Sequence, residues 1–211
     1  MLIPHLVALL LPLPLTPPLS PLQSSRTRSA LLCGTPSSIL IREAGPTDVD
    51  ALTDLTIEVF FGTLGSDYGF NNCRATAFFE LRGEQEANLR ARISDANAVN
   101  YMASSIDGSS EEIIGFVTCD GKGSLSNLAV HPTQQRRGIG RMLVERVLGE
   151  RQSTVLEVDA DNAAALELYA SCGFVRTGER PGTRYVVDWW RGRVIEKVTK
   201  IGMEFAQERP S

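Results

Sequence analysis

The feature of this 211-residue sequence that most constrains its fold is a strand–turn–helix pattern between Leu125 and Leu148. The apolar run from Leu125 to Val130 predicts a strand, which Pro132 ends because proline has no N–H for a sheet ladder. A basic turn follows, Gln135 to Gly140, in which two glycines bracket one residue. Apolar side chains at helical spacing then predict an amphipathic helix: Met142, Leu143, Val147 and Leu148.

This turn predicts an anion site. A helix N-terminus presents backbone N–H groups and partial positive charge, and glycines let a ligand approach the backbone. Arg136 and Arg137 add formal charge, so a phosphate or pyrophosphate would suit the turn. An ordinary tight connection is the alternative. The P-loop sequence is missing, and Leu143 stands where a dinucleotide-binding turn has its third glycine, so the pattern favours neither a GTP site nor an NAD site.

A second informative segment contains a carboxylate and a tyrosine. Glu157 lies between two apolar neighbours in the strand predicted for Thr154 to Val158. It is either a general base in a partly buried position or a carboxylate held in a salt bridge. Tyr169 shares a face with apolar residues of the helix predicted for Ala163 to Ser171, which is typical of a packed core tyrosine. Asp161 or Asn162 can cap that helix.

Both segments resemble the GNAT family of N-acetyltransferases. Gln-x-x-Gly-x-Gly at 135–140, preceded by Leu-Ala-Val-x-Pro and followed by Arg-x-Leu, resembles the acetyl-CoA loop of that family. Leu-Glu-Val followed by Asn-Ala-Ala-Ala, Leu-Tyr and Gly-Phe, over 156–174, resembles its ribosomal-protein-alanine N-acetyltransferase group. The resemblance implies an α/β fold with a GNAT-type mixed central sheet flanked by helices, acetyl-CoA as co-substrate and no metal.

The resemblance also implies roles for individual residues. Glu157 would be the proton acceptor and Tyr169 the proton donor, with Asn162 touching acetyl-CoA. Contacts to the acyl and pantetheine part are implied for Leu128, Ala129 and Val130, and contacts to the pyrophosphate for Arg136, Arg137, Gly138, Ile139, Gly140 and Arg141. The stretch 178–185 resembles an arginine-rich turn over the acceptor. Asp159, where the group usually has arginine, and the ending with Trp189-Trp190 depart from the pattern.

The acceptor is left open between three kinds of protein. The first transfers acetyl to protein N-terminal α-amines, or to lysine ε-amines as well, by direct attack. The second acts on small amines such as polyamines. The third is a non-catalytic acetyl-CoA-binding regulator, which would need neither Glu157 nor Tyr169.

Residues 1–37 differ from the rest in composition. They are rich in leucine, proline, serine and threonine, and the first acidic residue of the chain is Glu43. Scattered prolines exclude a membrane-spanning helix there. This composition is typical of a disordered targeting leader, with a plastid favoured over a mitochondrion or the secretory route, and a plain disordered tail is the alternative. Residues 38–211 are then one N-acetyltransferase domain, for which no membrane partner is expected.

Net charge and cysteine content argue against a nucleic-acid partner, a zinc site and a disulfide framework. A net charge of −4 does not support a nucleic-acid partner. The four cysteines stand singly, which indicates neither a zinc site nor a disulfide framework. His131 is interpreted as a loop residue. The oligomeric state is not readable from the sequence.

Hydrophobic periodicity predicts the element order β-α-α-β-β-β-α-β-α-β-β, an α/β layer fold. Besides the elements above, the predicted segments are a strand Ile39–Arg42, a helix from Pro46, a helix Ala75–Ala96 interrupted or weakened at Gly83, and strands at Val99–Ile106, Glu112–Cys119 and Phe174–Thr177. The extended segments Tyr185–Trp190 and Val194–Phe205 finish the chain.

Overall fold

A computed structural model describes residues 38–62, 72–107, 110–188 and 191–206. The leader predicted for 1–37 and the Trp189-Trp190 pair lie outside these residues, and those predictions remain predictions. Within the described residues, no helix is both long and apolar enough to cross a membrane.

Seven strands form two antiparallel sheets. The first has the order β1 (Ser38–Glu43), β2 (Val99–Asp107), β3 (Ser110–Cys119), β4 (Leu125–Val130), and the second has the order β5 (Ser153–Asp159), β7 (Gly192–Ala206), β6 (Val175–Asp188). A single parallel bridge, Ser124 to Val155, joins β4 to β5. Beyond this bridge β4 and β5 do not pair, so the two sheets are splayed apart, with the open end toward Val130.

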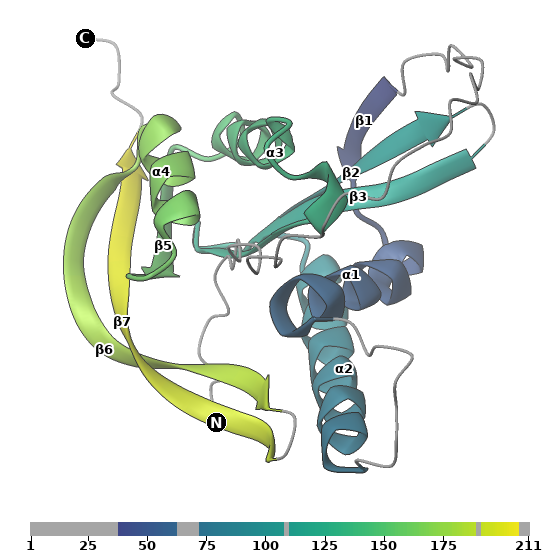
Figure 1. The fold of residues 1–211 in the computed structure, drawn as a ribbon. Helices are drawn as coiled ribbons and strands as arrows, with labels where there is room; N and C mark the ends of the chain where they lie inside the picture. Colours follow the sequence, from purple (N-terminus) through teal and green to yellow (C-terminus); the bar gives the residue numbers. More distant parts are fainter. Residues whose placement is uncertain (1–37, 63–71, 108–109, 189–190, 207–211) are drawn as a thin grey trace, which may run out of the picture.

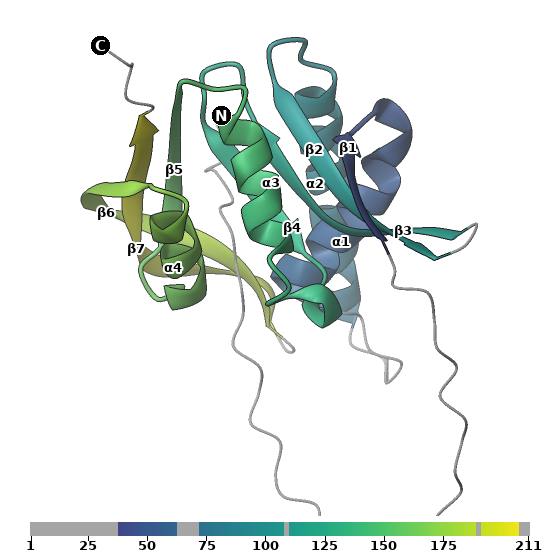
Figure 2. The ribbon, with the colours of Figure 1, turned by 90° about the horizontal axis from the view of Figure 1, so that it is seen from above.

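Four helices cover the two faces of this arrangement. Helices α1 (Val49–Phe61) and α2 (Asn72–Ile93) lie on one face, and α3 (Ile139–Leu148) and α4 (Ala163–Ser171) lie on the other (Figure 1). Viewed from above, α3 lies over the region between β5 and β4 (Figure 2).

Strand alternation divides the buried side chains between these layers. On β2, Tyr101 joins the cluster under α3 and α4, whereas the next residue, Met102, joins the cluster under α1 and α2.

The predicted element order is confirmed, with two corrections. Helix α2 is not interrupted at Gly83, because flanking residues such as Phe78, Leu81 and Leu89 are buried against α1 and outweigh the poor helix propensity of one glycine. The predicted division of this region into two strands and a turn is also wrong, because residues 175–188 form one continuous strand, β6. Pro181 is tolerated there because β6 is an edge strand and needs no N–H on its open side.

Candidate active site

The basic glycine turn has the backbone of an anion site. Arg136 and Gly138 both have left-handed backbones, with φ of 63° and 82°. Gly138 caps α3, and its carbonyl accepts the first helical hydrogen bond from Met142 N at 3.0 Å. The N–H groups of the residues between them therefore have no acceptor within the helix and point out of its N-terminus. Such a turn at a helix start attracts phosphate groups.

A cavity of about 260 Å³ opens at this turn. Of the ten residues predicted to bind the cofactor, seven line it: Leu128, Val130, Arg136, Gly138, Ile139, Gly140 and Arg141. Lining residues that the sequence interpretation missed come mainly from one face of α4, namely Ala164, Glu167, Leu168 and Ser171, and their helical spacing was the available signal. Val59 of α1 also lines the cavity, so residues from both helix layers meet at the open end of the splay.

Three predicted cofactor residues lie elsewhere. The side chain of Ala129 faces the α1–α2 layer, because it alternates with its two neighbours on β4. The Arg137 guanidinium donates to Gln134 Oε1 beside the cavity. Asn162 caps α4, accepting from Ala165 N at 3.2 Å, which confirms its predicted capping position.

The edge of β4 supplies further polar groups. His131 N donates to Ile114 O at 2.8 Å, so in the alternating antiparallel pattern residues 129 and 131 bond to β3. The backbone N–H and C=O groups of Leu128 and Val130 consequently face the splay. The Val130 carbonyl accepts from Gln135 Nε2 at 3.2 Å, consistent with this direction.

A tight contact shapes the cavity wall beside the turn. A Cβ on Gly140 would come within 3.2 Å of Leu168 Cδ2 on α4. Arg141 then ties the two helices together, donating to Ser171 O at 2.8 Å. The start of α3 and the side of α4 are thus held close, and only glycine leaves the backbone of this turn open to a ligand.

Tyr169 lies in the core beside this cavity but does not line it. Its side chain is fully buried and packs edge-on against Phe174, with ring centroids 5.5 Å apart. No residue of the described chain hydrogen-bonds its hydroxyl. Burial raises the pKa of Tyr169, so the hydroxyl keeps its proton at neutral pH. This hydroxyl, like those of Ser104 and Thr154, is buried without a partner among the described residues, so it is available to a ligand atom.

Glu157 faces the other layer. Its neighbours Leu156 and Val158 belong to the same buried cluster as Tyr169, so Glu157 projects from the opposite face of β5. Its carboxylate forms a two-pronged ion pair with Arg180 of β6, with Nε–Oε1 and Nη2–Oε2 distances of 2.5 Å each. The pair lines a separate hollow of about 390 Å³. The salt bridge considered as the alternative role for Glu157 is therefore present, and no local pattern identified Arg180 as its partner.

Asp159, two residues further along β5, is also paired. Lys200 Nζ lies 2.5 Å from its Oδ1 and Arg184 lies 3.6 Å from its Oδ2. Asp159 and Lys200 are both almost completely buried. The residue that departs from the family pattern thus fastens β5 to β7 and β6.

His131 and the cysteines have structural surroundings. His131 caps a short 3-10 turn, Pro132–Gln134, and its Nε2 lies 3.2 Å from Glu58 Oε1. Cys119 is buried and Cys172 half-buried, and both are free thiols. The described residues contain no group of three metal-ligating side chains.

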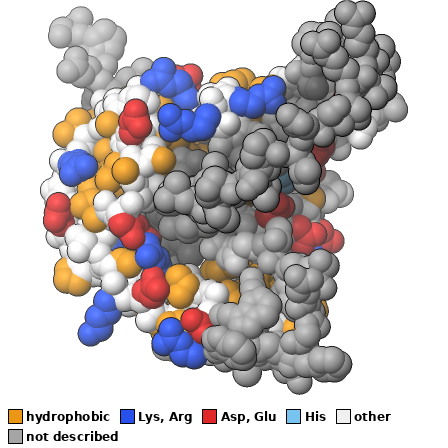
Figure 3. Space-filling model, in the orientation of Figure 1, with side chains coloured by type: hydrophobic (Ala, Val, Ile, Leu, Met, Phe, Trp, Pro, Cys, Tyr) orange, Lys and Arg blue, Asp and Glu red, His pale blue; other side chains and the backbone are white. Residues whose placement is uncertain are grey.

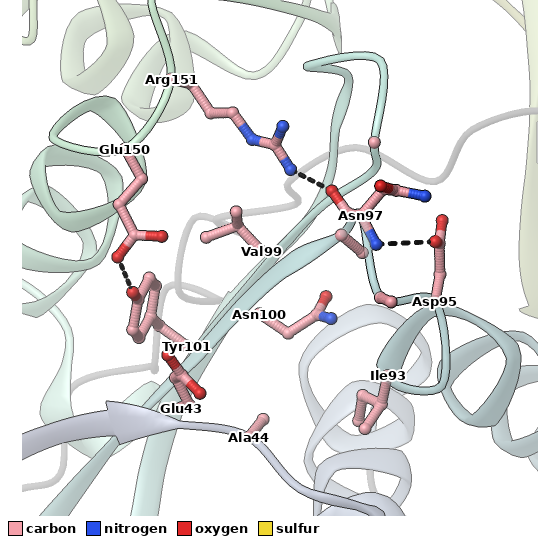
Figure 4. Close-up of a pocket in the computed structure, with 13 residues that line it drawn as sticks. Glu43, Ala44, Ile93, Asp95, Asn97, Val99, Asn100, Tyr101, Glu150 and Arg151 are labelled. Carbon is pink, nitrogen blue, oxygen red and sulfur yellow. Dashed lines mark hydrogen bonds between the residues drawn. The ribbon is translucent and has the colours of Figure 1, made fainter.

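A larger hollow, of about 580 Å³, lies near the closed end of the splay (Figure 4). Some of its polar groups bond to one another: the Tyr101 hydroxyl donates to Glu150, and Arg151 donates to Asn97 O (Figure 4). None of the predicted site residues lines it. The candidate site is therefore the cavity at α3 together with the Glu157 face.

Comparisons with known proteins show which family this chain resembles. The family model of the acetyltransferase (GNAT) domain matches residues 102–176. A ribosomal protein bS18-alanine N-acetyltransferase of Salmonella typhimurium is 37% identical over 102 residues, which cover 46% of this chain and 60% of that protein. The match therefore spans less than two thirds of that relative's length.

Solved structures give the same fold. The ribosomal-protein-S18-alanine N-acetyltransferase of Escherichia coli superimposes with a TM-score of 0.57 at 22% identity, covering 82% of this chain and 97% of that one. The Salmonella typhimurium protein yncA, whose structure holds its cofactor acetyl-CoA, gives a TM-score of 0.53 at 19% identity, covering 82% and 96%. These likenesses confirm the predicted α/β fold class.

Proposed function

This chain contains an acetyltransferase domain of the GNAT family, and on that premise we propose that it transfers acetyl from acetyl-CoA to amines, with protein N-terminal α-amines as the preferred acceptors. The observation that carries the proposal is the cavity at the start of α3, which combines a left-handed basic turn with the unpaired edge of β4. The N-acetyltransferase relative of Salmonella typhimurium supports the choice of acceptor.

The residues around the cavity suit acetyl-CoA. The N–H groups at the start of α3 and the charge of Arg136 would hold the pyrophosphate. The backbone groups of Leu128 and Val130 would bond the amide-rich pantetheine arm as a neighbouring strand does. The buried Tyr169 hydroxyl supplies a polar atom that no described residue satisfies. Acetyl-CoA, when bound, supplies the acetyl thioester.

Two proton transfers are then needed. An acceptor amine is protonated at neutral pH and must lose a proton before it can attack, and Glu157 would accept that proton directly or through a water. The N–H of Val130 would stabilise negative charge on the acetyl oxygen. Tyr169, which burial keeps protonated, would hydrogen-bond the departing thiolate and give it its proton. Most of the rate would come from holding amine and thioester together.

The placement of the two side chains supports a division of labour. Tyr169 lies in the layer of α3 and α4, as the cavity lining mostly does, whereas Glu157 projects toward the other layer. Under this proposal the cofactor enters from the α3–α4 face and the acceptor from the opposite face. They would meet between β4 and β5, where Glu157 lies two residues beyond Val155, the β5 residue of the parallel bridge.

The test is to incubate the full chain with acetyl-CoA and a set of peptides that carry free N-termini and internal lysines, and to locate acetyl groups by mass spectrometry. We expect acetylation of α-amines. Binding of acetyl-CoA with no acetylated peptide, but with acetylated spermidine, would replace the protein acceptor by a small amine. Binding with no acceptor acetylated at all would refute the proposed activity.

A further inference from the structure

Glu157 and Arg180 lie on one face of the second sheet although β7 separates their strands. Residues directly opposite in adjacent strands share a face, and Glu157 is opposite Gly202, which is opposite Gly178. Arg180 is two residues beyond Gly178 and therefore points to the same side. Because Gly202 has no side chain, the arginine can cross β7 and reach the carboxylate.

Two carboxylates on this face of β5 are neutralised in different ways. Asp159 and its partner Lys200 have side chains only 3% and 7% exposed, so this pair is fixed in the interior. Glu157 and Arg180 have side chains 28% and 55% exposed, so water can replace either partner. A partly exposed ion pair is screened by water and can be exchanged for a pair with another cation. Of these two carboxylates, only Glu157 is therefore accessible to a substrate.

Arg180 also occupies the in-plane hydrogen-bonding positions of both Glu157 carboxylate oxygens. A guanidinium that bonds both carboxylate oxygens, as Arg180 does at 2.5 Å, leaves no room for an amine in the same plane. Basic and acidic side chains are scattered among hydrophobic ones on the β6–β7 side of the molecule, on the left of Figure 3.

We propose that Arg180 is a positioning residue that keeps Glu157 ionised and correctly oriented until the ammonium group of the acceptor takes its place. This inference rests on the proposed function. It makes Arg180 a determinant of specificity as well, because a cationic amine can replace a guanidinium at the carboxylate, whereas a neutral hydroxyl or amide is a poor replacement. The guanidinium swings into water as the amine arrives, and the amine's proton passes to the carboxylate.

The experiment compares the full chain with Arg180→Ala, Arg180→Lys and a control, Arg176→Ala. Arg176 is an exposed residue of the same strand that has no ion-pair partner among the described residues. Removing the competing guanidinium should lower the KM for the acceptor amine about two- to fivefold, the range that a surface ion pair corresponds to. The acidic limb of the kcat/KM profile should move to higher pH, because the ionised carboxylate loses its cation. Arg180→Lys should fall between the two, and Arg176→Ala should match the wild type.

The inference would be overturned if the acceptor KM of Arg180→Ala stays unchanged or rises, or if the acidic limb does not move. In that case, acetyl transfer by the wild type would still leave the proposed function intact. A readout without turnover separates the two further. In ¹³C NMR the Glu157 carboxyl resonance should titrate at higher pH in Arg180→Ala than in the wild type. An unchanged midpoint would contradict the positioning role even in a protein that transfers no acetyl group.

Discussion

Replacing Tyr169 by phenylalanine removes one oxygen atom from a fully buried ring and leaves its edge-on contact with Phe174 in place. No described residue hydrogen-bonds that oxygen, so the folded state loses no partner. A buried polar group left unsatisfied costs about 1–3 kcal/mol. The free energy of unfolding of Tyr169→Phe should therefore stay level or rise by roughly 1 kcal/mol. Turnover should fall by about 10²- to 10⁴-fold if the hydroxyl is the proton donor.

Tyr101→Phe is the matched control. Tyr101 is equally buried, but its hydroxyl donates to Glu150, and it lies at the other hollow of the protein. Loss of this hydrogen bond should destabilise the protein by about 1 kcal/mol and leave kcat unchanged. Tyr169→Phe should thus lower turnover without loss of stability, whereas Tyr101→Phe should lower stability without loss of turnover.

Urea unfolding gives the stability of each variant, and steady-state kinetics with acetyl-CoA and an amine acceptor give kcat and KM. Burial raises the pKa of Tyr169, so its titration should not appear in the pH–rate profile near neutrality. Unchanged turnover in Tyr169→Phe would refute the donor role. A loss of stability as large as that of Tyr101→Phe would show that the hydroxyl has a partner in the folded protein.

Three further substitutions test other parts of the structure. Gly138→Ala places a side chain at φ 82°, which costs about 1–2 kcal/mol and should weaken acetyl-CoA binding by titration calorimetry, whereas Gly149→Ala, in right-handed helical backbone, should not. Lys200→Met leaves buried Asp159 without its nearest cation and should lower the free energy of unfolding, measured in urea, by about 3–5 kcal/mol. The double variant Lys200→Met with Asp159→Leu should largely recover this loss. An equal loss in both variants would contradict the interpretation of Asp159 and Lys200 as a buried ion pair. The hydrogen bond from Arg42 lowers the pKa of Asp48. The wild type should therefore be more stable than Asp48→Asn above the unfolded pKa of about 3.9, and this advantage should shrink as the pH falls below that value. An advantage that does not vary between pH 3 and 7 would contradict a stabilising Arg42–Asp48 pair.

The parts of the site that sequence predicted correctly depend on local periodicity. The strand at Leu125 to Val130 and the helix that follows the turn are predicted by an apolar run, a proline and two glycines within 16 residues of each other, although the helix begins at Ile139 rather than after Gly140. Glu157 and its apolar neighbours lie on opposite faces of β5, as the two-residue period of a strand predicts.

The partners of those residues depend on long-range register, which local patterns do not contain. Arg180 meets Glu157 only because β7 returns between β6 and β5 with Gly202 at the crossing point. The stretch around Pro181 has turn chemistry in isolation, and pairing with β7 makes it a strand. Asp159 was an unexplained departure in the sequence, and the structure accounts for it through Lys200, which lies 41 positions further along the chain.

The most direct measurement is a crystal structure of the full chain with CoA covalently joined to the N-terminus of a short peptide. We predict the pyrophosphate at the start of α3, the pantetheine along β4, and the peptide on the Glu157 face with Arg180 displaced from the carboxylate. The proposal that cofactor and acceptor approach from opposite faces would be contradicted if both lie on the α3–α4 face and the Glu157–Arg180 pair is intact.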